Sequence, residues 1–394
     1  MGLATRRTAA AGAALAGALI ACGVWFTGPA ATPTQERGPG GTAYVSAPAP
    51  AGYLLLDPAY DTASLFSVEG QQLEVFTELH WWLPREASGA ASTPLLAPDG
   101  STQIAYLRAA SEGVILSLRR GQVDLPLLSL RAPTGLRGSI PAGYLAVSDQ
   151  VVDEETGSLF SVLYVIEAVT GVGTDSPALR LTTLHASPQP LPLAFGFLEG
   201  IPSTVYYSLA TSTDASGSDL ENRGLFVLDL ATRDVSPFLD PTNRILGVSP
   251  DLTFVAFYSA ERTPPEIRLA RLDGGSTVLF QPLSGARESG RAVFSPDSSR
   301  VAWGTVVGGS GEGASFQLSL ASTFGGPASL VDLAALLPSD PSPIRHADPV
   351  AWLTDSALLI QVERESSSAV YRYQIDSGEI GPAAAGLFIT LLYP

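Results

Sequence analysis

Three near copies of one short segment constrain the fold of this chain more than any other feature. They read AVFSPDSSRVAW at 292–303, LGVSPDLTFVAF at 246–257 and PLLAPDGSTQIAY at 94–106. Ser or Ala followed by Pro and Asp suits a type I turn, because proline presets the backbone angle and the polar side chains bond neighbouring amides. The β-branched residue, alanine and aromatic that follow are typical of a buried strand. Each copy therefore predicts a turn that leads into a strand.

Looser copies of this turn occur along the chain, and a second kind of segment alternates with them. The second kind is a pair of apolar runs separated by a short polar turn, as in SLFSVEGQQLEVFTEL at 64–79 and LFVLDLATRDVSPFL at 225–239. Such segments predict two-stranded hairpins. One turn with its strands plus one hairpin gives a four-stranded antiparallel unit of about 40 to 50 residues, which repeats with a period of about 50. The equivalent turn positions are Asp99, Ala142, Glu199, Asp251, Asp297 and Asp355.

A repeated four-stranded unit of this size is typical of a blade of an all-β propeller. The turn motif resembles that of the TolB-type, WD-repeat-like propellers, in which a Ser-Pro-Asp-Gly corner precedes a strand that ends in alanine and an aromatic. The resemblance covers residues 52–394, although only the corner at 97–100 keeps the glycine. It implies a β-propeller that binds a protein or peptide at one mouth of the ring. Asp99, Asp251 and Asp297 are then turn-forming residues and not catalytic ones.

The expected number of blades depends on the two ends of the repeat region. Six turns alternate with seven hairpins, so the hairpin at 64–79 has no partner downstream. The apolar run GLFITLLY at 386–393 also has no partner of its own. If this run pairs with GYLLLDP at 52–58, both ends complete one blade, and a ring of seven closes without an open edge. A ring of six is the alternative.

The N-terminal segment at 1–26 has the layout of an export signal. A basic head, MGLATRR, precedes an apolar stretch that ends at the only cysteine of the chain, Cys22. The tetrapeptide at 19–22, Leu-Ile-Ala-Cys, resembles the lipobox of bacterial lipoproteins, which implies that Cys22 becomes lipidated. An uncleaved membrane anchor is a second interpretation. Cleavage near residues 28–31, with release of the protein, is a third.

Residues 27–51 are rich in Pro, Gly, Ala and Thr and contain too few large apolar residues to fold. We expect them to form a flexible to semi-extended tether. The chain thus divides into a signal peptide or anchor at 1–26, a linker at 27–51 and a propeller at 52–394. In all three interpretations of the N-terminus the propeller is extracytoplasmic, and we expect it to be tethered to the cell membrane.

Composition and motifs argue against several classes of function. The formal net charge is −16 and all 22 basic residues are arginine, which argues against nucleic acid as a partner and excludes lysine-based chemistry. The chain contains no Gly-x-Ser-x-Gly motif. Its three histidines lack metal-ligand spacing and are interpreted as surface or packing residues: His80, His185 and His346. We therefore expect no catalytic residue, no metal and no cofactor.

Two polar segments and two asparagines are the other candidate metal ligands in the sequence. The oxygen-rich segments at 212–224 and 148–158 lack the spacing of an EF-hand loop and are interpreted as solvated insertions between strands. Asn222 and Asn243 are interpreted as residues in or beside separate loops. None of these groups predicts a metal site.

The sequence predicts an exported, membrane-tethered β-propeller, expected to be monomeric, that binds a protein or peptide in the bacterial cell envelope. The alternative is an extracytoplasmic hydrolase or lyase with a carboxylate site at the mouth of the propeller channel. Two carboxylates in a polar cavity at the mouth would favour the enzyme. A smooth, shallow mouth would favour the binding protein.

Overall fold

The computed structural model describes most of the chain between residues 49 and 392. The predicted signal or anchor, Cys22 and most of the predicted linker lie outside the described residues. The described ranges are 49–57, 62–77, 92–96, 102–111, 113–120, 123–131, 135–138, 144–152, 155–157, 159–167, 191–197, 204–212, 220–229, 232–259, 261, 264–281, 283–308, 314–337, 342–365 and 367–392.

The described part of the chain is built from β-strands in six antiparallel sheets, and its one helix is the four-residue α2 (Leu333–Leu336). This confirms the predicted all-β class. Three sheets hold the N-terminal strands and the last strand. In spatial order they are β26 (Leu387–Leu392), β1 (Gly52–Leu56), β2 (Ala63–Ser67) and β3 (Gln72–Phe76); β4 (Ser92–Leu96), β5 (Thr102–Ala110), β6 (Gly113–Arg120) and β7 (Val123–Leu130); and β8 (Gly135–Gly138), β9 (Tyr144–Val152) and β10 (Leu159–Glu167).

The remaining three sheets hold the strands from β11 to β25. The first has seven strands: β11 (Leu191–Phe197), β12 (Thr204–Ser212), β13 (Leu220–Asp229), β14 (Val235–Val248), β15 (Phe254–Ser259), β16 (Arg268–Arg271) and β17 (Val278–Leu279). The other two are four-stranded: β18 (Ala286–Phe294), β19 (Arg300–Gly308), β20 (Ala314–Ser322) and β21 (Ser329–Asp332); and β22 (Ile344–Thr354), β23 (Ala357–Arg364), β24 (Ser368–Gln374) and β25 (Ile380–Ala385).

The long strand β14 explains why one sheet has seven strands. Its first half pairs with β13, with Val235 opposite Leu228, and its second half pairs with β15, with Val248 opposite Val255. One continuous strand therefore serves as the outer strand of one four-stranded group and the first strand of the next.

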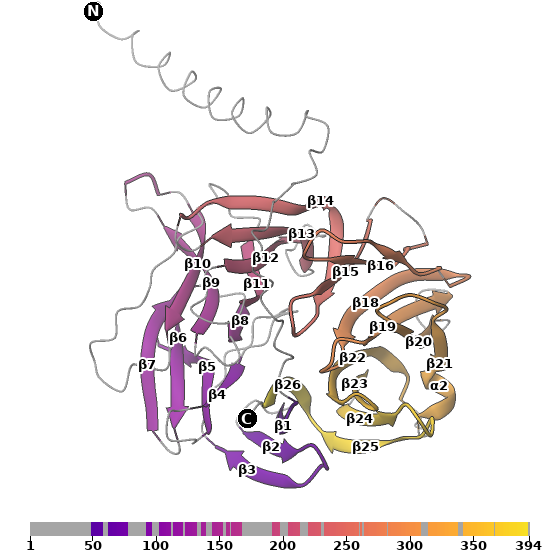
Figure 1. Ribbon diagram of the computed structural model, residues 1–394. Helices are drawn as coiled ribbons and strands as arrows, with labels where there is room; N and C mark the ends of the chain where they lie inside the picture. Colours follow the sequence, from indigo (N-terminus) through magenta and orange to yellow (C-terminus); the bar gives the residue numbers. More distant parts are fainter. Residues whose placement is uncertain are drawn as a thin grey trace, which may run out of the picture. The chain divides into compact units, whose positions relative to one another are not determined.

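The two ends of the repeat region pair as predicted. The strand β26 lies antiparallel to β1, with Leu392 opposite Gly52 and Leu387 opposite Leu56. The amide of Ala51 adds a 2.8 Å hydrogen bond to the carbonyl oxygen of Leu392. Sequence from both ends of the described region thus completes one sheet (Figure 1).

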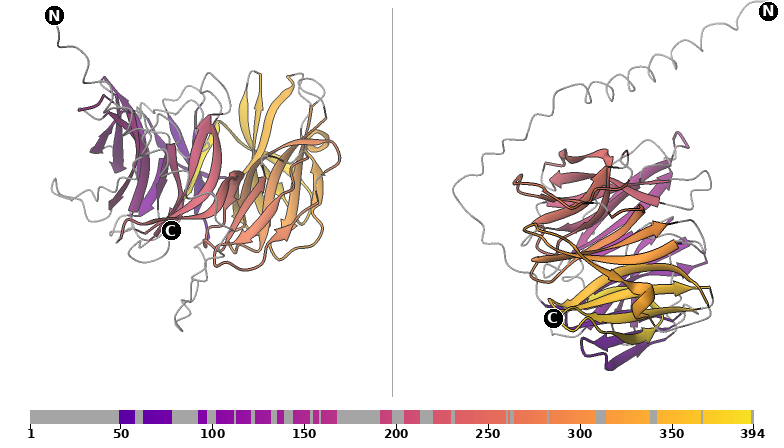
Figure 2. Two further views of the ribbon diagram at one scale, coloured as in Figure 1. Left: turned by 90° about the horizontal axis from the view of Figure 1, so that it is seen from above. Right: turned by 90° about the vertical axis from the view of Figure 1, so that its right-hand side faces the viewer.

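Neighbouring sheets are held together by apolar side chains, in a propeller-like arrangement (Figures 1 and 2). Contacts join the first strands of successive sheets, from β4 to β8, β11, β14, β18, β22, β26 and back to β4. Middle strands such as β23 have apolar residues on both faces, because each packs between two neighbouring sheets. Burial of these residues supplies the main stabilising free energy, at about 25 cal/mol per Å² of apolar surface.

Candidate functional site

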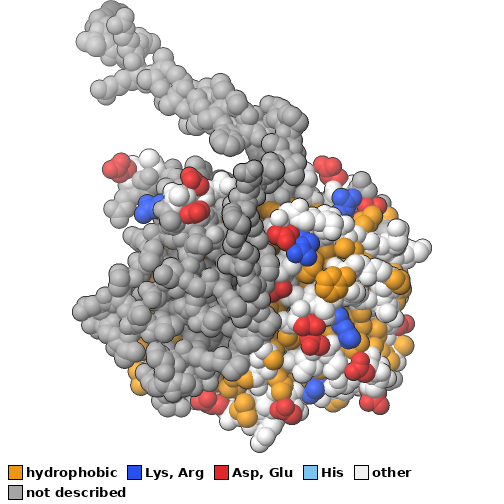
Figure 3. All heavy atoms as spheres, in the orientation of Figure 1, with side chains coloured by type: hydrophobic (Ala, Val, Ile, Leu, Met, Phe, Trp, Pro, Cys, Tyr) orange, Lys and Arg blue, Asp and Glu red, His pale blue; other side chains and the backbone are white. Residues whose placement is uncertain are grey.

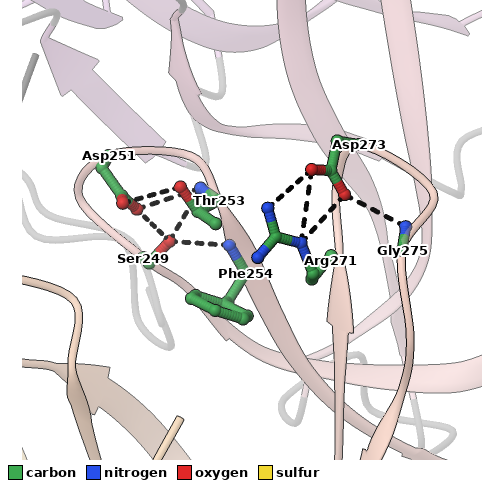
Figure 4. Close-up of polar contacts among 7 residues, drawn as sticks. All are labelled: Ser249, Asp251, Thr253, Phe254, Arg271, Asp273 and Gly275. Carbon is green, nitrogen blue, oxygen red and sulfur yellow. Dashed lines mark hydrogen bonds and ion pairs between the residues drawn. The ribbon is translucent and has the colours of Figure 1, made fainter. Parts of the chain in front are cut away.

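The corner at Ser249 is a closed polar turn whose side chains bond one another. The amide of Leu252 donates to the Ser249 carbonyl oxygen at 2.9 Å, as a type I turn requires. The Ser249 hydroxyl donates to Asp251 Oδ1 at 2.6 Å and accepts from the amides of Thr253 and Phe254, at 3.0 and 2.8 Å (Figure 4). Thr253 Oγ1 completes the network by donating to Asp251 Oδ2 at 2.6 Å.

The corner at Ser295 repeats this geometry. The Ser298 amide donates to the Ser295 carbonyl oxygen at 2.8 Å, the Ser295 hydroxyl donates to Asp297 Oδ1 at 2.5 Å, and the Ser299 amide donates to the same carboxylate oxygen at 3.0 Å. The fourth corner residue has a left-handed backbone in both turns, with φ of 54° at Leu252 and 56° at Ser298. Glycine adopts this conformation without strain, which explains its place in the Ser-Pro-Asp-Gly motif.

These contacts confirm that Asp251 and Asp297 form turns. The corners at Asp99, Ala142 and Glu199 lie outside the described residues. Asp355 begins the equivalent turn between β22 and β23, where it lies beside the Ser295 corner. The hydrogen bonds from Ser295 and Ser299, working against burial, lower the pKa of Asp297 to about 2. Burial, reinforced by the charge of Asp297, raises the pKa of Asp355.

A polar cluster joins the first strands of two neighbouring sheets. His346 and Asp348 lie on β22, with the His346 Nε2 atom 2.9 Å from Asp348 Oδ2. A Cβ atom at Gly290 on β18 or at Gly304 on β19 would collide with the Asp348 carboxylate. Arg291, next to Gly290, attracts Asp348 electrostatically, while burial lowers the pKa of its guanidinium group. The two glycines therefore provide the space in which Asp348 meets an arginine and a histidine.

The His346–Asp348 pair is compatible with two roles, proton transfer in catalysis and stabilisation of the fold. A carboxylate that orients a histidine is a common arrangement for general acid–base catalysis. His346 is half-exposed, with 50% of its side chain accessible, whereas Asp348 is 16% accessible. The His346 ring also contacts Phe316 edge-on, with the centroids 6.4 Å apart. His346 thus packs against a neighbour as predicted, and its link to Asp348 was not evident from the sequence.

Two segments interpreted as solvated insertions are partly strand, and this corrects the prediction. Residues 220–224 belong to β13, where Glu221 forms ion pairs with Arg223 at 2.5 Å and Arg244 at 3.1 Å. Asp149 lies on β9, is buried at 2% exposure, and accepts hydrogen bonds from the Arg131 amide at 3.0 and 3.1 Å. Both acids therefore support the fold.

The asparagines also differ from the prediction. Asn222 lies on β13 and Asn243 on the adjacent β14, so neither is a loop residue. Among the described residues, no group of three or more His, Cys, Asp and Glu side chains is placed to hold a metal ion. His80, His185 and Cys22 lie outside that part of the chain.

The most exposed large apolar side chain of the described structure is Phe324, at 77%. It lies in the turn between β20 and β21, at the same end of the sheet as the Ser295 corner, because the Thr323 amide donates to the Ser299 carbonyl oxygen at 2.9 Å. Leu279 on the neighbouring β17 is 49% exposed. We call Phe324, together with the Asp297 corner to which its turn is hydrogen-bonded, the Phe324 surface.

Sequence analysis missed the Phe324 surface. A single phenylalanine in the turn sequence STFGG carries no motif, and only its exposure in the folded chain distinguishes it. Figure 3 shows apolar side chains interspersed with charged ones on one face of the molecule. The other exposed large apolar residues of the described structure lie on outer strands, on β14 and on α2. They are Leu73, Val75, Val123, Val235, Leu330 and Leu336.

Comparisons with known proteins identify the fold. No protein-family profile and no curated protein sequence matches the chain. An acylaminoacyl peptidase in complex with Z-Gly-Gly-Phe-chloromethyl ketone aligns over 82% of this chain and 48% of its own, at 10% identity and a TM-score of 0.51. An oligogalacturonate lyase from Vibrio parahaemolyticus aligns over 86% of this chain and 93% of its own, at 11% identity and a TM-score of 0.51.

A TolB protein from Acinetobacter baumannii aligns over 87% of this chain and 81% of its own, at 14% identity and a TM-score of 0.41. The chain spans about half the length of the acylaminoacyl peptidases that it resembles. Likenesses at such identities show the fold alone. The chain has a propeller-like fold. Membership of the TolB-type family remains a prediction from the corner motif.

The described residues include no helix that is both long enough and apolar enough to cross a membrane.

Proposed function

We propose that this chain is an exported, membrane-tethered β-propeller that binds a protein or peptide partner at one mouth of its ring, in the bacterial cell envelope. The observation that carries partner binding is the exposure of Phe324, at 77%, on the turn between β20 and β21, the third and fourth strands of their sheet. Binding at the mouth of the ring is supported by the resemblance of the corner motif alone. Exposed aromatic side chains on a rigid scaffold are typical of interaction sites, because they bury much apolar area on binding at low entropic cost.

The proposal includes a ring of seven blades at 52–394. Its support is the continuous strand β14, which divides the seven-stranded sheet into two four-stranded groups, together with the contacts that join seven first strands in a closed order. Pairing of β26 with β1 leaves no open edge at the join.

The proposal also includes export and tethering through the N-terminus. Its support is sequence alone: a basic head, an apolar stretch and Cys22 at its end, followed by a Pro- and Gly-rich linker. The protein then acts as an extracytoplasmic monomer with no nucleic-acid partner.

The test is chemical crosslinking of the full chain in its native envelope, followed by purification and mass spectrometry. The proposal predicts a specific partner protein whose yield falls when the propeller is unfolded before crosslinking. A native chain that crosslinks to no protein and sediments as a free monomer after mild extraction contradicts the binding function.

A second candidate function is a hydrolase or lyase, and the pairing of His346 with Asp348 on β22 favours it. Oligogalacturonate and N-acylated peptides are the substrates to try, since proteins of similar fold carry names that refer to them. Turnover that disappears in His346→Gln and in Asp348→Asn would establish an enzyme. Absence of turnover in the wild-type protein would leave the binding function as the better proposal.

A further inference from the structure

The Phe324 ring stands on a rigid turn. The Thr323 side chain is buried at 1% exposure, and its hydroxyl donates to the Ser298 carbonyl oxygen at 2.8 Å. The Phe324 amide donates to the Ser322 hydroxyl at 3.2 Å, and the Gly325 amide donates to the Ser322 carbonyl oxygen at 3.1 Å. A ring held this way loses little backbone freedom when a partner binds.

The neighbouring sheet supplies the other side of the surface. Phe254 on β15 lies under the Phe324 ring in an edge-to-face contact, with centroids 6.4 Å apart and planes at 86°. The Arg271 guanidinium group sits over the Phe254 ring, 5.6 Å from its centroid, and pairs with Asp273 at 2.7 Å. The structure therefore already contains, at this surface, an arginine bound between an aromatic ring and a carboxylate.

Negative charge predominates around Phe324. On its own sheet, Asp297 is exposed and ionised at neutral pH, because hydrogen bonds from Ser295 and Ser299 outweigh burial and keep its pKa at about 2. Asp355 lies next to Asp297, whereas the charge of Asp273 is balanced by Arg271. The positive groups here are already engaged, since Arg271 pairs with Asp273 and Arg300 donates to the Asp355 carbonyl oxygen at 3.1 Å.

We propose that the Phe324 surface docks an arginine- or lysine-rich segment of a partner protein, with one cation over the Phe324 ring and its neighbours facing Asp297 and Asp355. This inference rests on the proposed binding function and names the surface and the partner's chemistry. A cation of the partner would lie over the Phe324 ring in the same way as the Arg271 guanidinium group lies over the Phe254 ring. Cation–π contact and charge complementarity then act together.

A second copy of this chain is a poorer occupant. Each copy carries a formal net charge of −16, and the surface itself is acidic, so two copies repel each other at this site. Self-association through Phe324 is nevertheless an outcome that the experiment distinguishes.

The first test measures binding of a short fluorescent peptide, in which arginine alternates with glycine, to the full chain in detergent. We expect Phe324→Ala and Phe324→Leu to weaken binding by about five- to tenfold and Phe324→Tyr to retain it, because only an aromatic face attracts a cation. Leu73→Ala, at an exposed apolar residue on β3, is the matched control and should change affinity by less than about twofold.

Three further results decide the chemistry. Asp297→Asn should weaken binding and reduce its dependence on salt, since screening acts on the charge it removes. A matched peptide with glutamate in place of arginine should not bind. The proposal is wrong if Phe324→Ala binds the arginine peptide with an affinity within about twofold of the wild type. It is also wrong if the wild type sediments as a dimer and Phe324→Ala sediments as a monomer, because Phe324 would then bind a second copy of this chain.

The second test separates this inference from the proposed function. A photo-reactive phenylalanine at position 324 or, as control, at position 73 is incorporated in the full chain and activated in the native envelope. Crosslinks at position 324 to an Arg- or Lys-rich segment support the docking surface. If chemical crosslinking captures a partner but position 324 does not, the binding function stands and the docking surface is wrong.

Discussion

The backbone amide of Asp297 donates a 3.3 Å hydrogen bond to Oδ1 of Asp355, and this bond joins the corners of two neighbouring sheets. Arg300 adds a second link, from Nη1 to the Asp355 carbonyl oxygen at 3.1 Å. Two acidic side chains thus lie close together, and they respond to their surroundings in opposite ways. Hydrogen bonds from Ser295 and Ser299 overcome burial and lower the pKa of Asp297 to about 2, whereas burial raises the pKa of Asp355.

The shifted pKa values of Asp297 and Asp355 predict that ionisation of the first stabilises the fold and ionisation of the second destabilises it. Because the pKa of Asp297 is lower in the folded than in the unfolded chain, its ionised form stabilises the fold above about pH 4, and this contribution disappears as the pH falls towards about 2. The advantage of the wild type over Asp297→Asn in chemical unfolding should therefore vanish across that window. An advantage that does not change with pH would contradict the assignment.

Asp355→Asn is the matched variant with the opposite sign. A raised pKa means that ionisation of Asp355 opposes folding, so the penalty exists at neutral pH, is relieved as the pH falls through the raised pKa, and is gone below about 4. We expect Asp355→Asn to be at least as stable as the wild type at neutral pH, with the difference lost in acid. Chemical unfolding at the same series of pH values measures it.

The two left-handed corner residues predict opposite effects of one substitution. Ser298→Gly removes backbone strain, together with a buried hydroxyl that has no hydrogen-bond partner among the described residues, and should raise the free energy of unfolding by about 0.5–1 kcal/mol. Leu252→Gly relieves the same strain but removes a side chain buried at 7% exposure, and should lower that free energy by about 2–5 kcal/mol. Urea titration compares the two, and equal effects would contradict this account.

The space around Asp348 predicts that glycine is required on β19. A Cβ atom at Gly304 would collide with the Asp348 carboxylate, so Gly304→Ala should cost about 1–3 kcal/mol and separate Asp348 from His346. Gly381→Ala is the control, because nothing lies within 4 Å of a Cβ atom at that position. Thermal unfolding should show a loss for the first variant and little change for the second; similar midpoints would remove the steric argument.

The pairing of β26 with β1 predicts that closure stabilises the whole propeller. Deletion of residues 387–392 exposes both the edge of β1 and the apolar residues Leu54 and Leu56, which pack against Leu387 and Leu392. We expect a lower unfolding midpoint for all tryptophan and far-ultraviolet signals together. Deletion of residues 393–394, beyond the strand, is the control. An unchanged cooperative transition in the longer deletion would show that closure contributes little.

The position of Cys22 predicts lipidation of the mature N-terminus. Each buried methylene of an acyl chain contributes about 0.8 kcal/mol to membrane binding, so two or more chains hold the protein at the membrane. Cys22→Ser should therefore leave an unprocessed precursor. Intact mass spectrometry of the native protein measures this, and an N-terminus at Met1 or an unmodified one near residue 31 would exclude the lipoprotein interpretation.

The corners and the strands were predictable because their causes are local. Ser249-Pro250-Asp251 specifies a turn through contacts within a few residues, and the buried run at 254–259 specifies the strand that follows. Pairing of 386–393 with 52–58 was predictable for a different reason: two apolar segments without partners remained once the repeats were counted. Glu221 and Asp149 were misread as solvated residues, because a polar stretch does not reveal an ion pair or hydrogen bond with a residue elsewhere in the chain.

Sequence by itself determined the all-β class, the repeated corner and the pairing of the two ends of the repeat region, because turn chemistry and alternation of apolar residues act over short distances along the chain. Only the tertiary structure decided that Asp348 would fill the space left by Gly290 and Gly304, and that Phe324 would stand exposed above Phe254. Those relationships depend on how neighbouring sheets pack. Sheet packing brings together side chains that are far apart in sequence, and no local pattern encodes which of them meet.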